Sequence, residues 1–188
     1  MAKKVTASAG KQKSTVNVKR PAWSDVYEGY PKVNGGTEIE SDLPMTDLFT
    51  SIFGADYDTT QFNNGCATRV SLGLLSGGLK RVGERDIVIS EKSHIHYGKS
   101  IEPGAARLKD FLIKIWGSAD YVIKYPLSFD DVSSVLNDKK GVYIMVYKRP
   151  ADHGGATGHA TLWTGNRAIG GNDHADSSAF AIYFWELK

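Results

Sequence analysis

The hydrophobic pattern of this chain changes period along its length. Apolar residues three and four positions apart predict four helices. The first follows an N-cap at Asp42 and ends at Gly54, and the second runs from about Cys66 to Ser76. The third ends at Gly117, and a short fourth helix begins at a capping box formed by Ser128 and Asp131. The apolar runs 142–147 and 180–187 predict strands, as do segments 160–163 and 167–169 around a turn at 164–166. A short strand is also expected at 87–89. Helices that precede an antiparallel sheet indicate an α+β fold.

The chain has 188 residues, a length that fits a single domain. Six of its 23 basic residues lie in the first 20 positions, where there is no acidic residue, so the remaining 17 face all 21 acidic residues. We therefore expect a flexible basic arm at 1–21 and one mildly acidic domain at 22–188, which begins with a connector packed on its surface. The domain has no basic patch with interleaved aromatic residues, so nucleic-acid binding is not expected.

The sequence also bears on where the protein acts. No apolar run approaches the roughly 20 residues that a membrane span needs, and the first residues have no apolar core for a signal peptide. We expect a protein made in the cytoplasm that is exported, if at all, by a route that reads no such signal. The single cysteine excludes an intramolecular disulfide and any multi-cysteine metal site.

That lone cysteine, Cys66, is the first candidate functional residue. It follows the polar turn Asn63 to Gly65 and lies in the first turn of a predicted helix, away from the apolar face of Val70 and Leu74. A helix N-terminus stabilises a thiolate by only about 0.3 to 1 kcal/mol, occasionally near 2. Lowering the thiol pKa to a useful value needs more than roughly 2.7 kcal/mol, and a nearby imidazole is the usual complement to the helix.

His159 is the best partner among the five histidines, because it alone begins a well-defined strand. Gly155 and Gly158 would let another backbone approach it closely. A third group must hold the other nitrogen of the imidazole. The segment GGNDHADSS offers Asn172, Asp173, His174 and Asp176, of which Asp173 is preferred.

Around these residues the chain resembles the fourth family of type VI secretion amidase effectors, which are NlpC-like, papain-like cysteine peptidases. The matching pieces are NNGCATRVSLGLL around Cys66, GHATLWTG around His159 and the terminal YFWEL. The likeness covers residues 22–188. It implies a papain-like, NlpC-like fold in which N-terminal helices, including one that carries the nucleophile, pack on a C-terminal antiparallel sheet.

The resemblance further implies a peptidoglycan amidase toxin that acts in the periplasm of a target bacterium. It would hydrolyse the bond between D-glutamate, through its γ-carboxyl, and meso-diaminopimelate. Cys66 would be the nucleophile, His159 the base and Asp173 the orienting acid, with Asn172 as the alternative third residue and the Cys66 backbone N–H as oxyanion donor. No cofactor is expected. The implied partners are the stem peptide, the type VI secretion apparatus and a cognate immunity protein that blocks the cleft.

Two other functions remain open on the sequence. A zinc amidase would use His94 and His96, with His153 or His159 completing the site, although no HExxH motif accompanies them. A binding module without catalysis would use exposed tryptophans to contact sugars or partners. The candidates are Trp23, Trp116, Trp163 and Trp185.

Overall fold

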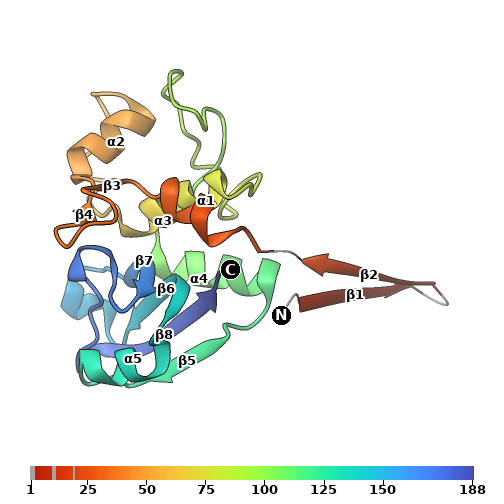
Figure 1. Ribbon diagram of the computed structural model, residues 1–188. Coiled ribbons are helices and arrows are strands. Elements are labelled where there is room, and N and C mark those ends of the chain that lie inside the picture. The colour runs from red at the N-terminus through yellow and green to blue at the C-terminus, as the bar shows by residue number, and fades with distance from the viewer. Residues whose placement is uncertain (1–2, 10–11, 19) are drawn as a thin grey trace.

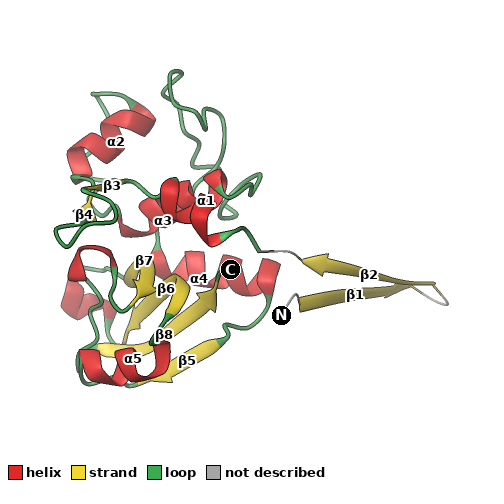
Figure 2. Ribbon diagram, in the orientation of Figure 1, coloured by secondary structure: helices red, strands yellow, loops and turns green. Residues whose placement is uncertain are grey.

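The computed structural model describes residues 3–9, 12–18 and 20–188, and its centre is a four-stranded antiparallel sheet with strand order β5-β8-β6-β7 (Figures 1 and 2). The strands are β5 (Tyr121–Lys124), β6 (Lys139–Tyr147), β7 (Gly158–Gly165) and β8 (Ala179–Glu186). Residues 141–146 of β6 are all buried. Val142 and Ile144 belong to one hydrophobic cluster, whereas Tyr143 and Met145 belong to a second, because successive side chains point to opposite faces.

Helices cover both faces of this sheet. On one face lie α3 (Cys66–Ser76) and α4 (Ala105–Trp116), whose apolar residues form the first cluster with Val142 and Ile144. On the other face lies α5 (Phe129–Leu136), which contributes Val132 and Leu136 to the second cluster. The capping box of Ser128 and Asp131 starts α5 as predicted. The α+β prediction is confirmed.

The helix α3 is the central element of the helical layer. Its predicted bounds are confirmed, but every residue from Cys66 to Leu75 is buried, so it has no solvated face. It packs against α1 (Trp23–Glu28), and a Cβ at Gly73 would lie 2.6 Å from the Val26 carbonyl oxygen. Cys66 is therefore enclosed by packing rather than presented on a polar side of the helix.

Three local predictions are wrong. The N-cap of α2 (Met45–Phe53) is Pro44, because Asp42 belongs to β4 (Ser41–Asp42), which pairs with β3 (Lys32–Val33). Residues 167–169 make only a bridge between Trp163 and Ala168 before the short 3-10 helix η2 (Ile169–Gly171). Residues 87–89 likewise make only a bridge, between Val88 and Ser100.

At the N-terminus, the backbone of β1 (Lys3–Ala9) pairs antiparallel with β2 (Gln12–Val18). The expected arm also includes residues 1, 2, 10, 11 and 19, which lie outside the described residues, and the division at residue 21 stays a prediction. Arg20 already contacts the domain, because its guanidinium donates to Asp120 and to the carbonyl oxygen of Glu186. The Trp23 N–H donates to the Lys188 carbonyl oxygen at 2.8 Å, which joins the beginning of the domain to its end.

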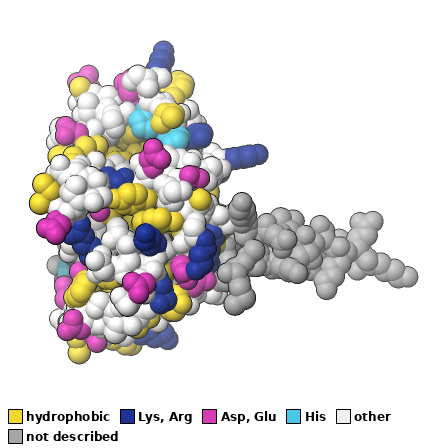
Figure 3. Space-filling view, viewed as in Figure 1, with side chains coloured by type: hydrophobic (Ala, Val, Ile, Leu, Met, Phe, Trp, Pro, Cys, Tyr) yellow, Lys and Arg dark blue, Asp and Glu magenta, His cyan; other side chains and the backbone are white. Residues whose placement is uncertain are grey.

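The surface carries charges of both signs. On the face shown in Figure 3, Lys and Arg side chains are interspersed with Asp and Glu side chains. Within the residues that the structure describes, no helix is both long enough and apolar enough to span a bilayer.

Candidate active site

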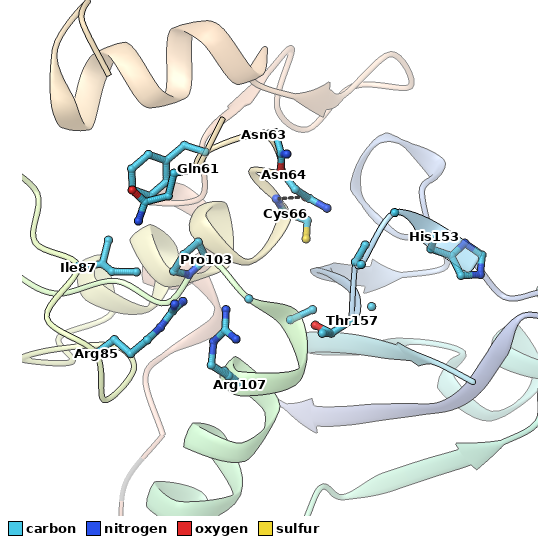
Figure 4. Close-up of a pocket in the computed structure, with 17 residues that line it drawn as sticks. Gln61, Asn63, Asn64, Cys66, Arg85, Ile87, Pro103, Arg107, His153 and Thr157 are labelled. Atoms are coloured by element: carbon cyan, nitrogen blue, oxygen red, sulfur yellow. Dashed lines mark hydrogen bonds between the residues drawn. The ribbon is translucent and has the colours of Figure 1, made fainter. Parts of the chain in front are cut away.

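Cys66 lies at the first position of α3 and lines a cleft of about 460 Å³ (Figure 4). The other walls are the turn at 61–64, the start of α4 at Gly104 and Ala105, and the loop 153–158 that leads into β7. Only 4% of Cys66 is exposed, yet the residue borders open space. A substrate that enters this cleft therefore meets the only thiol of the chain.

The start of β7 brings His159 to the same region. His159 directly follows Gly158, which lines the cleft, and pairs with Met145 of β6. A Cβ at Gly158 would lie 2.0 Å from the Met145 carbonyl oxygen, so the close pairing of the two strands requires glycine there, as the sequence indicated. The backbone N–H of Ala160, the residue after His159, faces the Cys66 thiol and favours its anionic form.

Burial keeps both groups neutral. It raises the pKa of the Cys66 thiol, and the N–H groups of Ala160 and Ala67 together with the charge of Arg69 oppose that shift only in part. Burial, followed by the charges of His174 and Arg69, lowers the pKa of His159 to about 3. The sequence predicts a thiolate at Cys66, but in this structure the proton belongs on the sulfur and the imidazole is neutral. Among the described residues no hydrogen bond joins the thiol to the imidazole.

The candidates for the third residue follow η2. The Asp173 carboxylate accepts the Ala175 N–H at 2.8 Å, and its backbone carbonyl accepts the Tyr143 hydroxyl at 2.7 Å. The described residues place no hydrogen bond between His159 and either Asp173 or Asn172, and the buried Nε2 of His159 has no hydrogen-bond partner. His174 lies beside His159 instead, with ring centroids 4.5 Å apart. The roles of Asp173 and Asn172 stay predictions.

The expected oxyanion donor is already engaged. The Cys66 backbone N–H donates to the Asn64 side-chain oxygen at 3.1 Å (Figure 4). The Asn64 oxygen thus occupies a donor at the N-terminus of α3, where a developing negative charge would sit. A substrate oxygen would therefore have to replace the Asn64 oxygen at this donor.

A polar network that the sequence did not reveal holds the start of α3. The Arg69 guanidinium donates to the Leu43 carbonyl oxygen at 2.7 Å and lies 3.6 Å from the Asp42 carboxylate. Asp42 also accepts the hydroxyl of the fully buried Tyr30 at 2.7 Å, and Tyr30 reaches Thr161 of β7 at 3.4 Å. This network ties the segment after α1, β4, α3 and β7 together around the site, although its members are far apart in the sequence.

The histidines of the zinc alternative are used locally. His94 Nδ1 accepts the His96 N–H at 3.0 Å, and His96 Nε2 lies 2.9 Å from the Ser76 hydroxyl. His153 stacks on Tyr147 at the cleft, with centroids 3.7 Å apart. The described part of the chain contains no group of three or more His, Cys, Asp or Glu residues that is placed to hold a metal ion.

The tryptophans of the binding-module alternative serve mainly in packing. Trp163 and Trp185 are fully buried, Trp116 is 3% exposed and Trp23 is half-buried. The indole N–H of Trp163 donates to the Leu136 carbonyl oxygen at 3.0 Å. Buried, hydrogen-bonded indoles are typical of a core.

The fold and the site together define a class of small α+β protein, in which a cysteine at a helix start lies in a cleft beside a histidine on an antiparallel sheet. Comparison with known families then places the chain more closely. Residues 62–185 match the model of type VI secretion system (T6SS) amidase effector protein 4, Tae4. The chain belongs to this family, and the resemblance seen in its sequence is confirmed.

Solved structures show the same fold. The type VI effector Tae4 from Enterobacter cloacae is 23% identical, with a TM-score of 0.64 over 90% of this chain and 98% of that chain. A Tae4–Tai4 effector–immunity complex from Enterobacter cloacae gives 22% identity and a TM-score of 0.62, covering 90% of this chain and 100% of that chain. The effector–immunity system Tae4/Tai4 from Salmonella typhimurium is 20% identical, with a TM-score of 0.63 over 90% of this chain and 100% of that chain. No curated protein sequence matched the chain.

Proposed function

We propose that this T6SS amidase effector is a cysteine peptidase that cuts the peptidoglycan stem peptide between the γ-carboxyl of D-glutamate and meso-diaminopimelate. The observation that carries the proposal is the position of Cys66 at the start of α3, in a cleft, with its thiol at the N–H that follows His159. Family membership supports an amidase, and the resemblance supports the bond. The packing of the α3 nucleophile helix on an antiparallel sheet supports a papain-like, NlpC-like fold.

The reaction begins with proton transfer from the Cys66 thiol to His159 as the sulfur attacks the γ-glutamyl carbonyl carbon. His159 then gives that proton to the diaminopimelate nitrogen as the C–N bond breaks, which leaves a thioester. Water attacks the thioester while His159 takes a proton from it, and the proton returns to sulfur when the C–S bond breaks. Asp173, or Asn172, would orient the imidazole after the 172–176 loop adjusts.

The oxyanion would be stabilised by the Cys66 backbone N–H at the N-terminus of α3. In the free protein this N–H donates to Asn64. Substrate binding would therefore move the Asn64 side chain and expose the donor at the moment when charge develops on the carbonyl oxygen.

The partners and the location follow from the same family. Tae4 proteins have been solved as effector–immunity complexes with Tai4, so we expect a cognate immunity protein to cover this cleft. The T6SS apparatus would deliver the protein, without a signal peptide, into the periplasm of a target bacterium, where peptidoglycan lies.

Mass spectrometry of digested peptidoglycan tests the proposal. Wild-type protein should release fragments that end in D-glutamate and fragments with a new diaminopimelate amine. Cys66→Ala and His159→Gln should reduce the release at least about a hundredfold, because loss of the nucleophile or the base removes the acyl-transfer route. Cys66→Ala releasing fragments at near the wild-type rate would overturn the mechanism.

A matched histidine substitution separates the alternatives. His94→Gln should keep wild-type activity, because His94 is bound locally to His96 and lies outside the cleft lining. A zinc amidase predicts the reverse, with activity lost in His94→Gln and on chelation. A binding module predicts that wild-type protein sediments with peptidoglycan and releases no new amine.

A further inference from the structure

Two arginines form one wall of the cleft that contains Cys66. Arg85 comes from the loop before α4 and Arg107 from the first turn of α4, and both line the cleft. Figure 4 shows the two side chains next to each other beside Pro103, with the Cys66 thiol across the open space. The mildly acidic domain thus places two positive charges close to its candidate nucleophile.

A buried carboxylate holds both guanidinium groups. Glu102 is 1% exposed, and its Oε1 accepts Arg85 Nη2 at 2.7 Å, Arg107 Nε at 3.1 Å and the Gly104 N–H at 2.9 Å. Its Oε2 accepts Arg85 Nε at 3.3 Å. Two cations on one anion leave a net positive charge, and these contacts restrict where the arginines can point.

The outer edges of the guanidinium groups remain available. The described part of the chain provides no hydrogen-bond acceptor for Nη1 and Nη2 of Arg107 or for Nη1 of Arg85, and the two side chains are 54% and 43% exposed. The described residues that line the cleft include no Asp or Glu. The N-terminal end of α4 at Gly104 and Ala105 borders the same space and adds to its attraction for anions.

We infer that Arg85 and Arg107 form a carboxylate-binding subsite that selects an acidic peptide and places its scissile carbonyl at Cys66. A guanidinium presents its N–H groups in a planar fork that matches a carboxylate. The inference rests on the proposed function, because the stem peptide has free carboxylates on both sides of the bond that Cys66 would attack. These are the α-carboxylate of D-glutamate and the side-chain carboxylate of diaminopimelate.

Synthetic stem tetrapeptides test the inference. The parent peptide is L-Ala-γ-D-Glu-diaminopimelate-D-Ala with its terminal carboxyl amidated. One derivative is also amidated at the D-glutamate α-carboxyl, and another at the diaminopimelate side-chain carboxyl. We expect one derivative to lower the kcat/KM of wild-type protein about 10- to 100-fold, the range for loss of hydrogen bonds to a charged group. The derivative that does so identifies the bound carboxylate.

The Arg107→Gln variant shows whether the subsite causes this preference. It should lower kcat/KM on the parent peptide about as much as amidation lowers kcat/KM of the wild-type protein. The variant should then cleave the amidated peptide with nearly the same kcat/KM as the parent peptide. Arg107→Lys should recover part of the loss, because it keeps the charge without the fork. Arg81→Gln is the matched control, since Arg81 is half-exposed, pairs with Asp86 and lies outside the lining.

The outcomes separate this inference from the proposed function. If wild-type protein cleaves none of the peptides and no peptidoglycan, the proposed function fails. If it cleaves all three equally, or if Arg107→Gln matches wild type on the parent peptide, cleavage stands and the carboxylate subsite is wrong. An equal loss in Arg107→Gln on all three peptides would also overturn the subsite, because a damaged fold would reduce every rate alike.

Discussion

At the scale of single residues, the resting state of Cys66 is the central feature. The thiol is buried and its pKa is raised, whereas the neighbouring His159 has its pKa lowered to about 3. In the mechanism proposed above, substrate binding must align the thiol with the imidazole before the proton moves. Such a site holds little free thiolate, which limits side reactions of the only cysteine.

Alkylation by iodoacetamide measures this state directly. At pH 7 we expect folded protein to react more slowly than the same cysteine in urea, because burial raises the pKa of the Cys66 thiol and so lowers its thiolate fraction. The folded rate should continue to increase with pH above the ordinary thiol pKa. Intact mass reports the label without ambiguity, since Cys66 is the only thiol.

Cys66→Ser is the control for labelling at other side chains and should take up no label. Rapid alkylation of the folded protein at pH 6 would contradict the neutral pair. It would point instead to a thiolate held by an imidazolium, as in papain-like sites where histidine stabilises the anion.

At the scale of elements, the position of α3 depends on Arg69. Its guanidinium connects the helix to β4 through Leu43 and Asp42, and Asp42 is in turn bound by Tyr30 of the segment after α1. Removing one partner of a buried ion pair leaves the other charge uncompensated, which costs about 3 kcal/mol or more. This network therefore fixes the helix start that carries Cys66.

We expect Arg69→Met to lower the free energy of unfolding by about 3 kcal/mol in urea titrations. The half-exposed Arg81 provides the matched control. Arg81→Met should change the free energy of unfolding by less than about 1 kcal/mol, as for exposed ion pairs. Adding Asp42→Asn to Arg69→Met should recover part of the loss, because the amide removes the unpaired charge. A loss in Arg69→Met no larger than in Arg81→Met would show that the network does not hold α3.

The sequence predicted the elements whose signals are local. Glycines at 77 and 78 end α3, the Ser128 and Asp131 pair starts α5, and the apolar run of β6 is buried on both faces. It did not predict α1, nor the short strand β5, which gains its order from pairing with β8. On sequence alone the turn at 164–166 predicts a full hairpin, because a single bridge and a hairpin share the same turn residues.

In the candidate site too, the sequence predicts the residues that have a local signal and misses those that depend on tertiary contacts. The sequence predicts Cys66 and His159 as a pair because each stands at the start of an element with a clear boundary, and the structure confirms those two boundaries. The Arg69 network and the Glu102 cluster were missed, because their partners come from distant segments that only the tertiary fold brings together. Loop composition named Asp173 as a candidate but does not determine where its carboxylate points, which here is toward the Ala175 N–H.

At the scale of the whole molecule, two buried histidines couple stability to pH. Burial, followed by Lys99 and His94, lowers the pKa of His96 to about 4, and burial lowers that of His159 to about 3. Both values lie below the ordinary histidine pKa of about 6.5 that the unfolded chain has. Between the folded and the unfolded pKa values, the unfolded state binds more protons than the folded state does. The free energy of unfolding is therefore highest above pH 6.5 and declines as the pH falls toward the pKa values of the folded state.

We therefore expect the free energy of unfolding to fall between pH 7 and pH 5, by up to about 2 kcal/mol for each of the two histidines. Urea titrations at pH 7, 6 and 5 measure this slope. His96→Gln should reduce the decline by about half, since glutamine does not titrate and can still hydrogen bond to Ser76. If the free energy of unfolding of His96→Gln declined with pH as much as that of wild type, proton uptake by His96 would not be the cause of the acid destabilisation.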